Sequence, residues 1–397
     1  LAATPLHSCL VSLGTPRSMD ARAVETSSSL IPSLNTQARR EMELWQFFDM
    51  NSCDIAEELA HSGTLKTIIS VKTVLCVLGL ISITLLLKRK GLSWLAHPHT
   101  QCMFGVHIFS TYMATVFYLC CFVTDLIRFT MSGDEECAYA LPFWFAFTSR
   151  LFAVTGTFGQ LFSMAAIALE RLYASIRPVS YESLNSQLMK STGSVGVLLL
   201  SFGMVFGLCV PGVKWPEFAA SFTIRTVENQ QRFQWLVNVE VLLELFVLFT
   251  FHFSLYLNFR KKISENNDYV TARYQVSSNK KVIVLLLPIF WTHFCCIFVT
   301  SFGLVIYPYV TPTDTPVNHG VFLEMVALAP LYAVTMPLIM FISLRDKRPG
   351  RSHLDLGQAD HFATLETLFD KKEEETGLVK VVHEAITVLE AMFCCKV

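Results

Sequence analysis

Charged residues are scarce in this chain of 397 residues, because Asp, Glu, Lys and Arg together make up only 16% of it. Soluble domains usually carry a charged share of about a quarter. So few charges cannot cover a soluble surface of this size, and 52% of the residues are hydrophobic. A concentrated basic surface, which phosphate binding needs, is also lacking, and the formal net charge is −1. The composition therefore argues against nucleic acid as a partner and predicts a protein that lies in the lipid bilayer.

Recognisable catalytic motifs are lacking as well. The sequence contains no Gly-rich phosphate loop, nucleophile elbow or paired-histidine zinc motif. Most of the twelve cysteines lie inside apolar segments, where cysteine behaves as a small apolar residue rather than as a metal ligand. The sequence therefore predicts no enzyme, no cofactor and no metal site.

Long apolar segments are what the sequence does have. A transmembrane helix needs about 20 mostly apolar residues. Seven segments meet this requirement, at residues 67–87, 101–125, 141–169, 193–213, 233–257, 282–307 and 321–344. They predict an all-α membrane protein, a seven-transmembrane helix bundle over residues 63–345. Residues 1–62 form a segment before the bundle, and residues 346–397 form a tail after it.

Lysine and arginine indicate how the bundle is oriented, because cytoplasmic loops are enriched in them. They collect after the first, third, fifth and seventh segments and are sparse in the alternate loops. This predicts an extracellular N-terminus and a cytoplasmic tail. Residues 1–62 are expected to be largely disordered. The stretch before Met42 has two interpretations, a native leader or a non-native extension.

Ionisable residues within the apolar segments are candidates for a ligand site, because a charge at mid-membrane is costly and normally faces protein, water or a partner. Arg150 lies about 12 Å along the third segment, at roughly 1.5 Å per residue. Glu240 and Glu244 share one face of the fifth. If these helices are neighbours, we expect Arg150 to pair with one glutamate and leave the other for a ligand; a permanent ion pair is the alternative. Glu324 either rims the same cavity or snorkels to the surface.

The histidines and the outer cysteines are expected to have structural roles. Three histidines in apolar contexts are interpreted as hydrogen-bonded core side chains, namely His107, His252 and His293. Cys137, at the outer end of the third segment, is expected to form an extracellular disulfide with Cys53 or Cys209, and the residues alone leave that choice open.

A polytopic transporter is the alternative class of function. It would use Arg150, Glu240 and Glu244 as a substrate or proton site. The apolar segments contain prolines that can kink helices, but no inverted internal repeat is visible, and such repeats are common in transporters. The lack of such a repeat weighs against a transporter.

The stretch "AIALERLYASIRP" places Glu170 and Arg171 at the cytoplasmic end of the third segment, with Pro178 eight residues after the glutamate. This spacing resembles the Asp/Glu-Arg-Tyr motif of G-protein-coupled receptors. Leu172 stands where that motif has tyrosine. The chain also has "LLLPIFW" for Cys-Trp-x-Pro and "MPLIMF" for Asn-Pro-x-x-Tyr, and these departures argue against an ordinary rhodopsin-like receptor.

A closer resemblance covers about residues 53–345. The stretches "EECAYALPFWFAFTSR", "ALERLYASIRP", "ARYQVSSNKK" and "LAPLYAVTMPLIMFISLR" resemble nematode serpentine chemoreceptors of the Sra and Srab type. The resemblance implies a receptor in the plasma membrane of sensory neuron cilia. Such a receptor binds an external small molecule in the outer half of the bundle and activates a heterotrimeric G protein.

The resemblance also implies roles for individual residues. Glu170 and Arg171 would form the switch, and the residues expected to face the G protein are Arg273, Tyr274, Lys280 and Lys281. Cys53 and Cys137 match extracellular cysteine positions of the family, which favours that pair for the disulfide. Arg150 falls on a family position too, which favours a role shared by its members.

Overall fold

The computed structural model of the chain describes residues 52–90, 98–131, 137–177, 181, 187–226, 228–260, 270–310 and 315–345. All of them belong to one compact unit, Met50–Val397. The stretch before residue 52, the tail after residue 345 and the side chains of Arg273 and Tyr274 lie outside the described part. Predictions about them therefore stay predictions.

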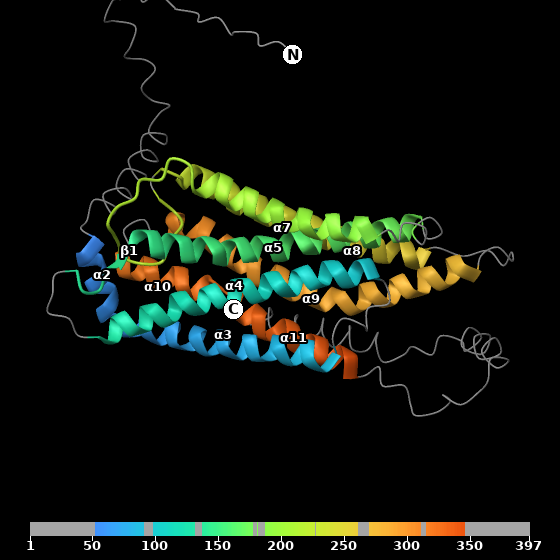
Figure 1. Ribbon diagram of the computed structural model, residues 1–397, viewed down its shortest axis with the longest axis horizontal. Coiled ribbons are helices and arrows are strands. Elements are labelled where there is room, and N and C mark those ends of the chain that lie inside the picture. Colours follow the sequence, from blue (N-terminus) through green and yellow to red (C-terminus); the bar gives the residue numbers. More distant parts are fainter. Residues whose placement is uncertain are drawn as a thin grey trace, which may run out of the picture. The chain divides into compact units, whose positions relative to one another are not determined.

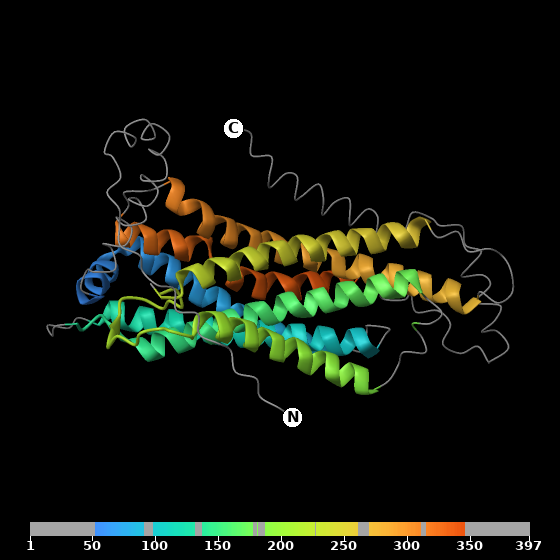
Figure 2. The same cartoon turned by 90° about the horizontal axis from the view of Figure 1, so that it is seen from above.

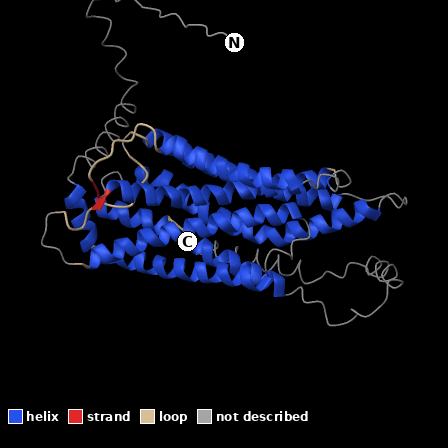
Figure 3. Ribbon diagram, viewed as in Figure 1, coloured by secondary structure: helices blue, strands red, loops and turns tan. Residues whose placement is uncertain are grey.

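Seven helical spans are long and apolar enough to cross a membrane, which confirms the predicted number. The helices that form them are α3 (Gly63–Lys90), α4 (Pro98–Thr130), α5 (Phe143–Ile176), α7 (Gln187–Cys209), α8 (Gln230–Arg260), α9 (Val270–Val310), and α10 (Pro316–Val326) with α11 (Ala329–Arg345). Helices make up nearly all of the described chain (Figures 1 and 3). Most of them extend a few residues beyond the predicted apolar segments, because polar residues continue a helix past the hydrocarbon layer.

Short elements gather at one end of the bundle. Helix α2 (Ser52–His61) lies there, as does a two-stranded antiparallel sheet of β1 (Leu141–Pro142) and β2 (Phe218–Ala219) (Figure 1). In this sheet, Leu141 lies opposite Ala219.

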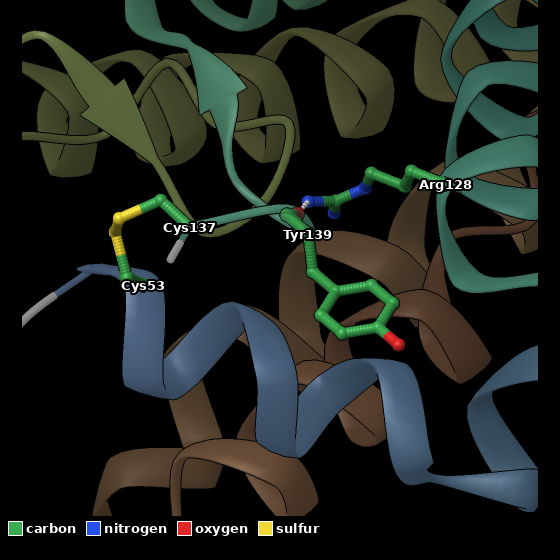
Figure 4. The surroundings of a disulfide bond; sticks show 4 residues. All are labelled: Cys53, Arg128, Cys137 and Tyr139. Atoms are coloured by element: carbon green, nitrogen blue, oxygen red, sulfur yellow. Dashed lines mark hydrogen bonds between the residues drawn. A yellow bond between two sulfur atoms is a disulfide. The ribbon is translucent and has the colours of Figure 1, made fainter. Parts of the chain in front are cut away.

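A disulfide joins Cys53, in α2, to Cys137, in the segment before β1 (Figure 4). Of the two partners that the residues left open, the structure thus has Cys53; Cys209 is a buried free thiol. Arg128 donates to the carbonyl of Tyr139, two residues after the disulfide, and to the carbonyl of Ala220 next to β2. We call this end of the bundle the disulfide end.

Helix α5 lies at the centre of the bundle and contacts α4, α7, α8 and α9 (Figure 2). Helix α3 packs against α4 and α11, and α9 packs against α8 and α11. Large apolar side chains on outer faces are exposed, such as Leu199 on α7 and Phe249 on α8. These faces suit contact with lipid, whose tails are as apolar as they are.

Two glycines of α5 allow α4 and α5 to approach closely. A Cβ atom at Gly156 would lie 2.7 Å from the backbone nitrogen of Ala114, and one at Gly159 would lie 2.4 Å from Oγ of Ser110. Small residues at helix crossings are a common way for membrane helices to pack. Any larger side chain at Gly156 must push the α4 backbone away.

We expect Gly156→Leu to destabilise the protein strongly, because overpacking typically costs about 1–3 kcal/mol and here the clash is with backbone. The thermal unfolding midpoint of the detergent-purified protein measures this. Gly196→Leu on α7 is the matched control, since nothing lies within 4 Å of a Cβ built there. Equal midpoints for the two variants would contradict the close crossing of α4 and α5.

The seventh span is broken between α10 and α11, at Ala327 and Leu328. Pro330 lies in the first turn of α11, where its missing N–H breaks no helical hydrogen bond. The hydroxyl of Thr300 in α9 donates to the carbonyl of Val326 at 2.8 Å and accepts from the N–H of Leu328 at 3.2 Å. A proline in an apolar segment can kink a helix; here the structure has a full break, and a neighbouring helix satisfies its backbone groups.

Candidate functional site

Arg171 lies near the end of α5 that is remote from the disulfide end, and it is only 2% exposed. Its Nη2 donates to Glu170 Oε1 at 2.7 Å, to Thr100 Oγ1 of α4 at 2.7 Å and to the hydroxyl of Tyr181. Its Nη1 donates to Asn279 Oδ1 of α9 at 3.0 Å. We call these five residues the Arg171 cluster. The guanidinium thus cross-links α4, α5, α9 and the segment that follows α5.

The carboxylate of Glu170 also has several polar partners. The hydroxyl of Thr100 donates to it at 3.0 Å, Tyr181 donates its hydroxyl proton, and Nδ1 of His99 lies 3.6 Å away. Burial raises the pKa of the Tyr181 phenol. The phenol therefore keeps its proton and remains a donor to Glu170.

A second layer of hydrogen bonds ties α8 into the Arg171 cluster. Asn279 Nδ2 donates to the hydroxyl of Ser175 at 2.9 Å and to the carbonyl of Arg171 at 3.3 Å. Asn258 of α8 donates to the same serine hydroxyl at 2.7 Å. Charge-assisted bonds in a buried network of this kind hold their partners in a defined geometry.

The residues expected to face a G protein lie close to this cluster along the chain. Lys280, next to Asn279, places its ammonium 4.0 Å from the ring centroid of Phe259 on α8. Lys281 is exposed. The side chains of Arg273 and Tyr274, six and five residues before Asn279 in α9, lie outside the described part.

A second charged group lies nearer the disulfide end and consists of Lys72 on α3, Arg150 on α5 and Glu324 on α10. The ammonium of Lys72 lies 2.7 Å from Glu324 Oε2, whereas Nη2 of Arg150 lies 3.8 Å from Oε1. We call these residues the Arg150 cluster. Glu324 does not snorkel to the surface, because it is held between two cations with its side chain 19% exposed.

The expected pairing of Arg150 with a glutamate of the fifth span is wrong. Glu240 on α8 accepts from the hydroxyl of Ser301 on α9 at 2.9 Å, and Glu244 contacts His293 of α9. Helices α5 and α8 are neighbours, as assumed. However, Arg150 points toward α4 and α10, and the two glutamates point toward α9.

A buried polar network lies between the two clusters. Oε1 of Glu244 lies 2.6 Å from Nδ1 of His293, whose Nε2 lies 3.2 Å from Oε1 of Gln160 on α5. Nε2 of His107 on α4 lies 2.7 Å from the hydroxyl of Tyr332 on α11. His107 and His293 are thus hydrogen-bonded core histidines, as predicted.

His252 is different, because it is exposed and bonds only the carbonyl of Leu248, at 2.9 Å on its own helix. Its interpretation as a core histidine is therefore wrong. The position lies on the outer face of α8 beside the exposed Phe253, whereas its other neighbour, Phe251, is buried in the core.

Thr100, Tyr181 and Asn279 were not assigned to the site from the sequence. Thr100 and Asn279 are isolated polar residues near predicted helix ends, and Tyr181 lies midway between the third and fourth predicted segments; the sequence offers no stronger signal for them. Within the described ranges, no group of three or more His, Cys, Asp or Glu side chains is placed to hold a metal ion. The geometry is that of a helix bundle with two charged clusters joined by a polar network.

Comparison with known proteins gives one family. Residues 50–360 match the profile of a family described as serpentine type 7TM GPCR receptor class ab chemoreceptor. The match covers all seven spans and both charged clusters. No curated protein matches the chain.

Proposed function

This chain belongs to the serpentine class ab chemoreceptor family of seven-transmembrane G-protein-coupled receptors, and from that membership we propose its function in detail. It is a multi-pass receptor of the plasma membrane, placed in sensory neuron cilia. It binds an external small molecule in the half of the bundle nearest the disulfide end and activates a heterotrimeric G protein at the Arg171 cluster.

Two observations support this orientation. Disulfides persist in oxidising compartments, so the end that carries the bond between Cys53 and Cys137 faces outward. The remote end carries Lys88, Arg260 and Lys281 at the ends or flanks of its spans, and cytoplasmic connections are enriched in such residues.

The buried cross-link made by Arg171 is the single observation that carries the proposal. Arginines at this place in G-protein-coupled receptors are held at rest and released on activation. Here the guanidinium bonds Asn279 of α9 and Thr100 of α4, so releasing it removes the charged link that ties α9 and α4 to α5. Interfaces between packed helices of this kind tend to have discrete alternative arrangements rather than deforming continuously. The two arrangements are the closed one described above and an open one that exposes a G-protein site.

Helix α5 is the physical connection between the two ends. It carries Arg150 in the Arg150 cluster, Gln160 in the central network and Arg171 in the Arg171 cluster, spaced over about 30 Å of helix. A ligand that contacts α5 and α10 near the disulfide end biases how α5 packs along its whole length. Such a bias shifts the population of the open state only as far as the ligand prefers that state.

Nucleotide exchange on a purified heterotrimeric G protein tests the proposal, with the receptor in lipid nanodiscs. We expect the receptor to raise exchange above the receptor-free rate and Arg171→Ala to abolish that increase. Arg177→Ala is the matched control, because Arg177 is exposed at the end of the same helix. The thermal midpoint of each variant confirms that it is folded.

Two results would count against the proposal. Undiminished exchange in folded Arg171→Ala removes Arg171 from the switch. Substrate flux across vesicles with no nucleotide exchange would select a transporter instead.

A further inference from the structure

The Arg150 cluster contains one positive charge more than it contains negative charges. Lys72 and Arg150 are two cations that share the single carboxylate of Glu324, and Lys72 takes the close position at 2.7 Å. The 3.8 Å between Arg150 Nη2 and Glu324 Oε1 is too long for a hydrogen bond. Nη1 of Arg150 is buried and has no hydrogen-bond partner among the residues that the structure describes. The guanidinium is therefore incompletely satisfied on both of its terminal nitrogens.

Other buried carboxylates in this half of the bundle have partners of their own. Asp125 lies 2.7 Å from Nη2 of Arg128, Glu240 is bonded by Ser301, and Glu244 contacts His293. None of these three forms an ion pair or hydrogen bond with Arg150 in the described part of the chain. The excess charge of the cluster is thus not neutralised by a direct protein contact.

Aromatic side chains form an apolar wall beside the two cations. The ring centroid of Tyr118 lies 4.9 Å from the guanidinium carbon of Arg150, and that of Phe122 lies 5.3 Å from the ammonium of Lys72. Both rings are buried on α4. An aromatic face stabilises a cation only modestly, whereas an unpaired charge away from water is costly. The surroundings therefore favour an added anion with an apolar body.

We propose that the Arg150 cluster binds a small organic carboxylate, whose oxygens pair with the guanidinium of Arg150 and whose apolar body lies against Tyr118. The inference rests on the proposed receptor function, since it names the chemical class of the ligand. A guanidinium presents two parallel N–H donors that match a carboxylate. One excess positive charge matches a monoanion, whereas a doubly charged phosphate would overcompensate it.

Thermal unfolding of the purified, G-protein-free receptor tests this with defined probes. The probes are acetate, hexanoate, octanoate, benzoate and phenylacetate, each compared with the alcohol and the amine of the same skeleton. We expect at least one acid to raise the unfolding midpoint while its alcohol and amine do not. Arg150→Met should raise the dissociation constant of that acid by about tenfold or more, because a charged hydrogen-bonded pair is lost.

Lys214→Met is the matched control for surface charge, because Lys214 has a side chain 87% exposed and should leave the dissociation constant unchanged. The inference is overturned if no acid in the panel stabilises the receptor more than the corresponding alcohol does. It is also overturned if an acid binds the Arg150→Met variant as tightly as it binds the wild-type receptor.

The stability of the ligand-free receptor gives a second test that needs no probe. Removing Arg150, which lies 3.8 Å from the shared carboxylate, leaves the close pair of Lys72 and Glu324 intact and should not destabilise, whereas removing Lys72 breaks that close pair. We therefore expect Arg150→Met to keep or raise the wild-type midpoint and Lys72→Met to lower it. If Arg150→Met lowers the midpoint as much as Lys72→Met does, Arg150 is already satisfied and the inference fails.

These measurements contain no G protein, so the carboxylate inference and the proposed G-protein coupling can each fail without the other. Loss of acid binding with intact nucleotide exchange overturns the carboxylate inference alone. Acid binding without any nucleotide exchange leaves the site standing and overturns the proposed coupling.

Discussion

Asn279→Leu is expected to raise ligand-free nucleotide exchange by about tenfold or more. Asn279 supplies the bond from α9 to Nη1 of Arg171 and two further bonds to α5. A hydrogen bond to a charged group contributes about 1.5–3 kcal/mol, which corresponds to about ten- to hundredfold in an equilibrium constant. If the closed state is the resting state, losing that amount shifts the population toward the open state. Leucine has the same number and branching of side-chain heavy atoms as asparagine, so the change removes the bonds without leaving a cavity.

The comparison that isolates this effect uses two variants of one helix. Val299→Leu changes an exposed residue of the same helix, 20 positions away along the chain, and should leave basal exchange at the wild-type rate. Arg171→Ala combined with Asn279→Leu should be inactive, because the released arginine is itself needed at the G-protein site. Wild-type basal exchange in folded Asn279→Leu would mean that α9 is not held through this bond.

The number of spans could be predicted from the sequence because hydrophobic length is a local property that each segment carries by itself. The break in the seventh span could be predicted only in part. Pro330 signals a disturbance, but whether the helix kinks or separates depends on the hydroxyl of Thr300, which comes from α9 and satisfies the freed backbone groups. The sequence of residues 321–344 alone therefore cannot predict whether the helix kinks or separates.

The partners of the charged residues could not be predicted for a related reason. Depth along a helix follows from residue number, so Arg150 and Glu240 were correctly recognised as intramembrane residues. Which neighbour each one faces depends on how its helix is rotated, and α5 turns Arg150 toward α4 and α10. Lys72 was missed because a single lysine near the end of an apolar segment also suits a snorkelling position.

Glu170 and Arg171 were found because their position at the end of the third segment is itself informative. Their partners Thr100 and Asn279 come from α4 and α9, and the bond between Arg171 and Asn279 spans 108 residues of sequence. An isolated threonine or asparagine at a helix end looks the same whether it is solvated or buried. Only the packing of the bundle distinguishes the two cases.

His293→Leu should cause the largest loss of stability among single substitutions in the central network. The change leaves the carboxylate of Glu244, only 2% exposed, without its 2.6 Å partner. Removing one member of a buried pair costs about 3–5 kcal/mol. Equilibrium unfolding of the purified receptor in detergent measures the loss. His252→Leu is the matched control and should change the free energy of unfolding by less than about 0.5 kcal/mol, as exposed substitutions usually do.

The double variant His293→Leu with Glu244→Met separates two effects on the free energy of unfolding: leaving one partner of the contact unsatisfied, and losing the contact itself. Replacing both members of a buried pair by apolar residues is often neutral or stabilising, so we expect the double variant to recover most of the stability lost by His293→Leu. Simple additivity of the two single losses would show that the side chains are not coupled. If stability returns while ligand-driven exchange does not, the pair is retained for switching. The apolar replacement removes the polar contact between α8 and α9, which an opening motion of α9 would have to rearrange.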